Sequence, residues 1–371
     1  MKTYSFKLYH AKRNKKLHRA INISGNIYNH CIALHKRYYR MYGKHLNMYK
    51  LQRHITKLKK TDKFSFWNML GSQAIQDITQ RIDRGYRLFF RNLKQGIRTA
   101  PPSFKKVRKY KSFTLKQAGF KLGDDNHIKI MGQGYRYHKS REIEGKIKIV
   151  TIKRDPLGDI YIYLVCETEE ATVKPRSGKS VGLDFGLGTF LTTSDGNKIE
   201  SPLFFKEGSK EIRKLNRSLS RKKKGSANRK RARFDLARGH KRIANRRRDF
   251  HFKLAKELSE AYSCICIEDL NLKGMQRLWG KKVSDLGFAD FVRILEHQCH
   301  KTGTELIKID RYYPSSKTCS SCGHVLEKLS LSTRTWTCPD CKAKHDRDRN
   351  AAINIHRVGA STFKGEVVRP A

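Results

Sequence analysis

The sequence predicts an α/β protein of several domains, and three patterns support this prediction. Apolar residues recur three or four positions apart between residues 11 and 99, which is the spacing of amphipathic helices. Between residues 103 and 168 they recur at every second position, as in half-buried strands. From residue 181 onward, short apolar strands alternate with helical segments. A chain of 371 residues is long enough for two or three such domains.

The composition indicates a polyanionic partner. The chain has 81 Lys and Arg against 33 Asp and Glu, a formal net charge of +48 that far exceeds what solubility requires. Nucleic acid is the leading candidate, because no run of 18 apolar residues could anchor the chain in a membrane. The N-terminus also lacks the apolar region and cleavage site of a secretory signal. We therefore expect a cytoplasmic protein with no membrane partner.

The first part of the chain is expected to be a small β barrel that carries a helical insertion. Residues 3–9 alternate like a strand, and residues 1–10 are expected to pair with further strands in residues 100–172. The helical insertion covers residues 11–99 and ends at Gly96 and Pro101. Residues 155–159 read as a hairpin turn and residues 174–179 as a linker to the next domain.

Residues 173–312 are expected to form a second α/β core, which is completed by a C-terminal helix and tail in residues 345–371. A buried strand contains Asp184, and a later apolar strand ends at Glu268. A helix over 288–300 and a strand over 305–310 follow, and the last helix contains Asp348.

Three carboxylates of this core predict a nuclease site. Asp184, Glu268 and Asp348 lie on the first strand, a later strand and the last helix, which is how an RNase H-like fold assembles its acids. Such clusters bind two Mg²⁺ or Mn²⁺ ions, one activating water and one stabilising the leaving oxygen. An acid at a strand end can also be a surface residue or a cap. Three together in apolar elements favour phosphodiester hydrolysis.

Helical geometry favours Asp348 over Asp346 as the third acid. Asp348 shares a helix face with Ala351, Ala352 and Ile355, so it should point inward. Asp346 stands nearer a capping position.

Four cysteines predict a structural zinc ribbon over residues 313–344. Cys319 and Cys322 form one C-x-x-C pair and Cys338 and Cys341 form another, with fifteen residues between the pairs. Four thiolates in this spacing suit tetrahedral zinc. An iron–sulfur centre is the alternative that all-sulfur ligation leaves open. The other five cysteines lie in apolar segments and are expected to be core residues.

A basic segment within residues 206–260 predicts a phosphate-binding track. Eighteen of the forty residues from 209 to 248 are Lys or Arg, against two acids. Leu236, Ile243 and Phe250 recur at seven and predict an amphipathic helix with its apolar stripe on the core. The cations that we expect to contact nucleic acid are Arg221, Lys222, Lys223, Lys224, Arg229, Lys230, Arg231, Arg246 and Arg247.

Weaker signals suggest base contacts. Gln76, on the polar side of a predicted helix, could read adenine, and Thr114 could touch a thymine methyl group. Tyr135 and Tyr137, interleaved with a base, could stack on unpaired bases or pack in the core. A solvated Gln and a strand Thr are the ordinary alternatives.

Taken together, these motifs resemble the TnpB (OrfB) family of insertion-sequence proteins, relatives of type V CRISPR effectors. The resemblance spans nearly the whole chain. It depends on Gly182-Leu-Asp184-Phe-Gly, Leu219-Ser-Arg-Lys-Lys-Lys-Gly-Ser, Ile267-Glu268-Asp-Leu, Tyr313-Pro-Ser-Ser-Lys-Thr-Cys319, Arg334-Thr-Trp-Thr-Cys338-Pro and Asp346-Arg-Asp348-Arg-Asn-Ala-Ala.

The resemblance implies an RNA-guided DNA endonuclease encoded by a transposable element. A transposon-derived guide RNA would pair with a double-stranded DNA target, and a RuvC domain would cut beside a short motif. Residues 11–99 would be the recognition lobe, the barrel the wedge domain, and the ribbon the target-nucleic-acid-binding insertion. A nucleoid-associated prokaryotic protein and a companion transposase encoded nearby fit the same resemblance.

Three other functions compete. A DNA transposase acting directly on element ends would also use three acids, but nothing beyond the N-terminal helices marks a separate end-binding domain. An RNA-guided repressor would bind without cleavage. A structural RNA-binding protein offers no reason for three carboxylates in apolar elements.

Overall fold

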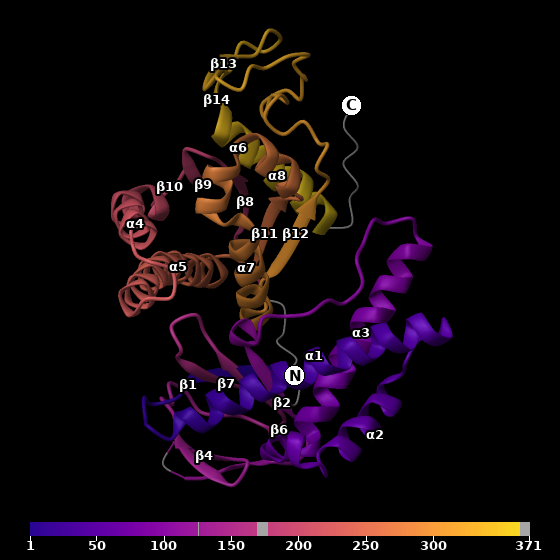
Figure 1. The fold of residues 1–371 in the computed structure, drawn as a ribbon. Helices are drawn as coiled ribbons and strands as arrows, with labels where there is room; N and C mark the ends of the chain where they lie inside the picture. Colours follow the sequence, from indigo (N-terminus) through magenta and orange to yellow (C-terminus); the bar gives the residue numbers. More distant parts are fainter. Residues whose placement is uncertain (125, 169–176, 364–371) are drawn as a thin grey trace. The chain divides into compact units, whose positions relative to one another are not determined.

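The computed structural model describes residues 1–124, 126–168 and 177–363, and it is a mixed α/β structure (Figure 1). The chain divides into two compact units, Met1–Glu170 and Ala171–Ala371. Residues 174–176 of the expected linker and residues 364–371 of the expected tail lie outside the described residues.

The first unit contains two antiparallel sheets. One has the order β1-β7-β6-β2, formed by Lys2–Lys7, Ile160–Glu167, Lys146–Arg154 and Ser112–Leu115. The other has the order β3-β4-β5, formed by Phe120–Leu122, His127–Ile130 and Gln133–Arg136. An isolated bridge between Leu8 and Tyr137 joins them. The predicted hairpin turn connects β6 to β7, where the Asp155 carboxylate accepts backbone N–H groups of Leu157 and Asp159.

Side chains from both sheets form one core in this unit. Phe6, Phe113 and Ile162 are almost completely buried. Tyr135 and Tyr137 are each only 2% exposed, so packing, and not base stacking, is the correct interpretation of this aromatic pair.

Helices complete the first unit. They are α1 (Asn14–Tyr42), α2 (Met48–Leu58) and α3 (Ser72–Lys94), with the 3₁₀ helices η1 (Asp62–Met69) and η2 (Val107–Lys109). The apolar periodicity expected within residues 11–99 corresponds to α1 and α3. Our sequence patterns did not identify α2 and η1, which are held by the Asn47 cap and the buried Trp67. Among the described helices, none is long and apolar enough to cross a membrane.

The second unit is built on a five-stranded mixed sheet. Its order is β10-β9-β8-β11-β12, formed by Lys198–Glu200, Thr189–Thr193, Ser180–Phe185, Cys264–Glu268 and Glu305–Ile309. The first three strands are antiparallel, and β11 is parallel to both β8 and β12. The expected strands with Asp184 and Glu268 are therefore adjacent.

Alternation along β8 and β11 separates two differently covered faces. Leu183 and Ile265 pack against α7 (Phe288–Thr302) and the end of α5 (Ala227–Ala261). Cys266 packs on the other face with Ile355 of α8 (Arg347–Phe363). The helix α6 (Leu272–Leu286) precedes α7, and α8 crosses the sheet in Figure 1.

Two glycines let α8 approach the sheet closely. A Cβ atom on Gly182 of β8 would collide with the Ala352 carbonyl oxygen of α8. A Cβ atom on Gly359 of α8 would collide with the Cys266 sulfur of β11. Because backbone and core atoms cannot yield easily, only glycine fits at either position.

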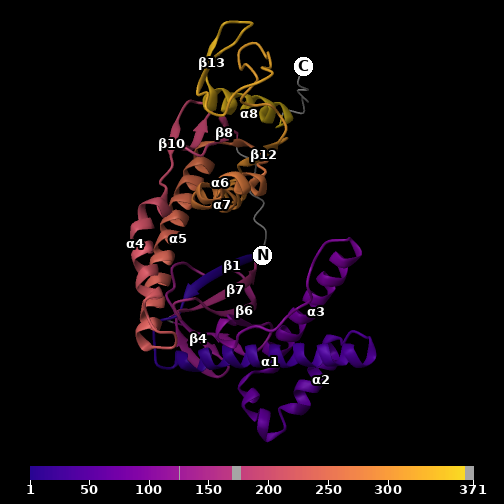
Figure 2. The same cartoon turned by 45° about the horizontal axis from the view of Figure 1, so that its top comes forward.

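The basic segment forms two helices, α4 (Phe204–Ser220) and α5, which lie side by side (Figure 2). Gly208 of α4 is covered by Ile243 of α5, so the first part of the predicted stripe packs on α4, not on the core. Phe250 and Leu254 continue the stripe and reach the core. The prediction of a single core-facing stripe was therefore wrong for Ile243, because a second helix supplies its partner.

Adding a methyl group at Gly182 or Gly359 should disrupt the seat of α8. We expect Gly182→Ala and Gly359→Ala each to destabilise the second unit by about 3 kcal/mol or more, through overpacking. Gly188→Ala is the matched control, because a Cβ atom there meets nothing within 4 Å, and it should change stability by less than about 0.5 kcal/mol. Scanning calorimetry measures the effect, and equal melting temperatures for all three variants would contradict it.

Candidate catalytic and zinc sites

The three predicted carboxylates converge on the face of the sheet that α8 covers. In β8, Asp184 shares the face of Gly182, which contacts α8. In β11, Glu268 shares the face of Cys266, which also contacts α8. Asp348 lies in the first turn of α8 itself. The close seat of α8 thus brings one acid from the helix to two acids from neighbouring parallel strands.

The charges of these residues interact. Burial, followed by the negative charges of Glu268 and Asp348, raises the pKa of Asp184 from an ordinary 3.8 to about 8, although the positive charges of Arg347 and Arg334 act in the opposite direction. Burial also raises the pKa of Glu268, against a hydrogen bond donated by the Ser315 hydroxyl. Without a cation, the site therefore resists full ionisation.

Asp346 and Asp348 have different surroundings. Asp346 accepts the backbone N–H of Arg349 at 3.0 Å, as a helix cap, and pairs with Lys198 at 2.8 Å. Asp348 lies 3.6 Å from the Arg334 guanidinium. Asp346 is thus engaged in starting the helix, while Asp348 is the acid whose charge reaches Asp184.

Oxygen donors of this kind suit a hard divalent cation. Within the described residues, the three carboxylates do not form a set whose ligand atoms all lie within 4.8 Å of one another. Two ions about 3.5–4 Å apart do not require such a set, because each ion binds only some of the ligands. The carboxylates fit divalent ions by their chemistry and by their mutual repulsion.

The four cysteines form a tighter cluster. The sulfur atoms of Cys319, Cys322, Cys338 and Cys341 all lie within 4.8 Å of one another. The Cys319–Cys341 and Cys322–Cys338 sulfurs are each 3.6 Å apart. A tetrahedral zinc ion with bonds of about 2.3 Å requires sulfurs roughly 3.8 Å apart, so the cluster fits zinc. The other five cysteines are buried, as expected for core residues.

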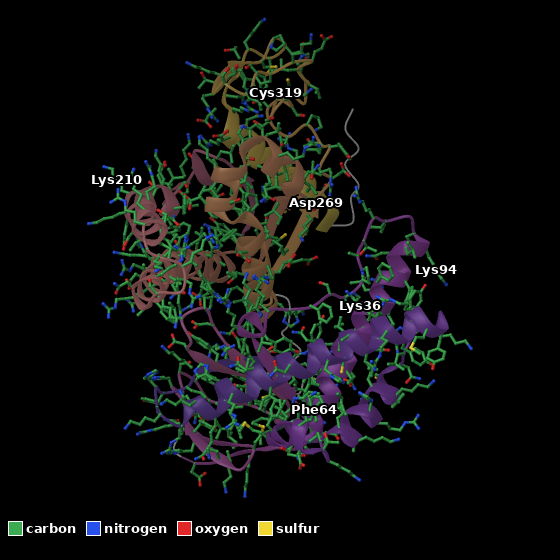
Figure 3. All side chains as sticks on the ribbon, viewed as in Figure 1. Lys36, Phe64, Lys94, Lys210, Asp269 and Cys319 are labelled. Carbon is green, nitrogen blue, oxygen red and sulfur yellow. The ribbon has the colours of Figure 1, made fainter. Side chains whose placement is uncertain are left out.

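Short backbone elements build this cluster. The Cys319 N–H donates to the His324 carbonyl, and the Cys338 N–H donates to the Ala343 carbonyl. Strands β13 (Thr335–Thr337) and β14 (Lys344–Asp346) then lead directly into α8. Figure 3 labels Cys319 in this part of the chain.

The predicted phosphate-binding cations differ in exposure. Those that are exposed are Arg221, Lys222, Lys223, Lys224, Lys230, Arg231 and Arg246. Figure 3 shows nitrogen-tipped side chains projecting around Lys210 in the same hairpin. Arg229 donates to the Leu219 and Lys222 carbonyls, and Arg247 donates to those of Ser284 and Asp285. These two arginines are therefore already used to hold the fold.

The two predicted base contacts also differ. Gln76 is half-buried on α3. Thr114 is 7% exposed, and its hydroxyl is occupied by Arg81 at 2.8 Å and Thr151 at 3.0 Å. Thr114 is therefore buried and hydrogen-bonded within the sheet, and a contact with a thymine methyl group would require its neighbouring side chains to move away.

The sequence patterns missed two side chains at the acid site. Ser315 bonds to Glu268, and Arg334 pairs with Asp348. Both occur in motifs that carried the family resemblance. Their position just before Cys319 and Cys338 was the available signal, but no spacing rule links either to an acid far along the chain.

Solved structures share this fold. A Cas12f1 chain in complex with sgRNA and target DNA matches with a TM-score of 0.56 and 14% identity, over 93% of this chain and 83% of that one. The mini RNA-guided endonuclease Cas_phi3 matches with a TM-score of 0.51 and 9% identity, over 96% and 92%. The chain therefore has the fold of compact CRISPR effectors.

Sequence similarity identifies the family. A protein-family model described as "Probable transposase" matches residues 163–278, and one described as "Cas12f1-like, TNB domain" matches residues 288–355. A "Putative RNA-guided DNA endonuclease" of Streptomyces pristinaespiralis is 35% identical over 85% of this chain and 79% of that protein. The "Putative RNA-guided DNA endonuclease InsQ" of Escherichia coli K12 is 29% identical over 92% and 88%. The chain belongs to the TnpB (OrfB) family.

The raised pKa of Asp184 predicts a pH-dependent stability. Between its ordinary value of 3.8 and about 8, the folded metal-free protein holds a proton that the unfolded chain has lost. Raising the pH through this range should therefore destabilise the fold, by at most about 1.4 kcal/mol per pH unit for one proton. Asp184→Asn should flatten the decline.

Thermal denaturation of the zinc-loaded protein, at several pH values and without Mg²⁺ or Mn²⁺, measures this effect. Parallel declines for the wild type and Asp184→Asn would contradict the assignment.

Proposed function

We propose that the protein is an RNA-guided DNA endonuclease that hydrolyses phosphodiester bonds at Asp184, Glu268 and Asp348. The convergence of these three acids on the α8 face carries the proposal. An electrostatically coupled set of carboxylates is costly to a fold unless it binds cations. The names of the similar proteins from Streptomyces and Escherichia coli support the same activity.

Mg²⁺ or Mn²⁺ bound by these carboxylates would supply an activated water and stabilise the leaving oxygen. The chain itself positions these carboxylates. Asp184 and Glu268 are held by adjacent parallel strands, so their spacing is set by the sheet. Ser315 engages one oxygen of Glu268, which leaves the other for a metal ion.

The strand order β10-β9-β8-β11-β12 supports an RNase H-like, RuvC-type core for the second unit. We propose that the cysteine cluster binds structural zinc within a target-nucleic-acid-binding ribbon. In the first unit, the two sheets linked at Leu8 and Tyr137 support a wedge-type barrel, and α1 to α3 support a recognition lobe.

The proposed partners are a guide RNA and double-stranded target DNA. A net charge of +48 and the exposed lysines of the α4–α5 turn suit a phosphate backbone. The similar Cas12f1 chain was solved with sgRNA and target DNA, which supports this pair of partners. Protein contacts of this kind give affinity, while base pairing supplies the choice of sequence.

Cleavage of a matched plasmid tests the activity. Purified protein with its guide RNA, Mg²⁺ and a plasmid that carries the target and its adjacent motif should produce linear DNA. Asp184→Ala should lower the rate by at least about a thousandfold, because the metal site loses a ligand. Asp346→Asn is the control and should retain cleavage, because Asp346 is not one of the three proposed metal ligands and asparagine can also cap the helix.

The same preparation separates the competing functions. An intact plasmid with bound guide RNA would favour the RNA-guided repressor. Sequencing of nucleic acid that copurifies with the protein should find one abundant RNA, and its absence would favour a transposase acting directly on element ends.

The exposed turn between α4 and α5 should bind phosphates. Replacing Lys222 and Lys223 together with alanine should weaken RNA binding, and it should reduce the slope of log K against log salt by roughly 1.4, the value for two single-strand contacts.

The matched control replaces Lys253 and Lys256, whose charges are already paired with Asp249 at 2.8 Å and Glu260 at 3.7 Å. Filter binding at several salt concentrations measures both double variants. Equal slopes for the two would exclude the turn as a phosphate contact.

A further inference from the structure

We propose that Ser315 is a positioning residue for Glu268, held in place by Asn350 and Asn354, and that this contact couples the zinc ribbon to the divalent-ion site. The inference rests on the proposed metal-binding role of the three acids. It concerns side chains to which neither the motifs nor the resemblance assigned a part.

Asn350 and Asn354 form a clamp on one turn of the chain. They lie one helical turn apart on α8, and they are 2% and 1% exposed. The Asn354 amide donates to the carbonyls of Ser315 at 2.8 Å and Thr318 at 2.7 Å. The Asn350 amide donates to the same two carbonyls, at 3.4 Å and 2.7 Å.

The clamp also grips the start of the ribbon. The Asn350 side-chain oxygen accepts the backbone N–H of Ser320 at 2.9 Å. Cys319, a member of the sulfur cluster, therefore lies between Thr318 and Ser320, two residues whose backbone is bound by α8. The ribbon cannot shift at its root without breaking contacts to the helix that contains Asp348.

Ser315 connects the clamped turn to the acid site. Its side chain is buried, and its hydroxyl donates to Oε1 of Glu268. A carboxylate rotates easily about its terminal bond, and this hydrogen bond restricts that rotation. Hydrogen bonds to a metal ligand orient it for binding, and their loss commonly lowers metal affinity ten- to a hundredfold.

The arrangement is poorly explained by stability alone. Among the described residues, the side-chain oxygen of Asn354 is buried without a hydrogen-bond partner. An unpaired buried oxygen destabilises a fold. Asn354 is thus placed for its two donated bonds, both of which hold the turn that positions Ser315.

His345 adds a second link between the ribbon and α8. Its Nε2 atom lies 3.0 Å from the Cys319 sulfur, and its ring packs on Trp336 at a centroid distance of 4.7 Å. His345 precedes Asp348 by three residues. The sulfur cluster therefore contacts β14, the strand that leads into α8, in addition to the turn that Asn350 and Asn354 hold.

Direct Mn²⁺ binding tests the inference without relying on cleavage. The full chain, loaded with zinc and guide RNA, is titrated with Mn²⁺ and followed by electron paramagnetic resonance, with Asp184→Asn as the background. We expect Ser315→Ala to weaken the Asp184-dependent binding about tenfold or more. Ser316→Ala in the same turn is the matched control, and it should bind like the wild type.

Asn354→Asp tests the clamp, because it keeps the size but replaces two donors with an oxygen facing two carbonyls. It should weaken Mn²⁺ binding and also speed the release of zinc to a chelator, whereas Ser315→Ala should leave zinc content and melting temperature unchanged. Those two readings separate loss of positioning from loss of folding.

Wild-type Mn²⁺ affinity in Ser315→Ala, or in folded Asn354→Asp, would overturn the inference. So would a wild type that binds Mn²⁺ no better than Asp184→Asn. A wild type that binds Mn²⁺ but cuts no plasmid would instead refute the endonuclease proposal and leave the coupling intact.

Discussion

The close contact of α8 with the central sheet is the constraint on which the second unit depends. Gly182 and Gly359 remove the two side chains that would hold the helix away from β8 and β11. The distance gained is small, but it decides whether an acid in the first turn of the helix can share a site with acids on the strands. The same face of the sheet therefore packs against α8 and presents the carboxylates.

This arrangement explains why some features could be predicted from sequence and others could not. Strand period alone places Asp184 and Glu268 on particular faces, and helix period orients Asp348. The cysteine spacing similarly predicts the cluster. The contacts of Ser315 and Asn354 depend on two segments about forty residues apart meeting at one turn, and no local pattern encodes such a meeting. The hint was chemical, because an asparagine on a buried helix face must find partners.

In the first unit, prediction failed where local signals were weak. The helix α2 is short, η1 has no 3.6-residue period, and β3 and β5 are strands of only three and four residues. The Tyr135 and Tyr137 pair was ambiguous for a related reason: an aromatic residue beside a basic one reads the same whether its ring faces a base or a core. The pairing of Tyr135 with Ile128 and the bridge of Tyr137 to Leu8 decide that both rings point inward. The basic helical hairpin of α4 and α5 shows a different limit. A high density of charge predicts an exposed surface reliably, but it does not reveal which arginines, such as Arg229, make hydrogen bonds that the fold needs.

The root of the ribbon has an evolutionary consequence. Ser320 is tied to α8 through both backbone groups, by Asn350 at 2.9 Å and by Arg357 at 2.7 Å. The chain leaves and rejoins the α/β core of the second unit at neighbouring points that are fixed by the core itself. Lengthening a loop whose ends are already held together adds little entropy cost. The segment between them can therefore change in length and sequence while the acids beside it keep their positions on the core.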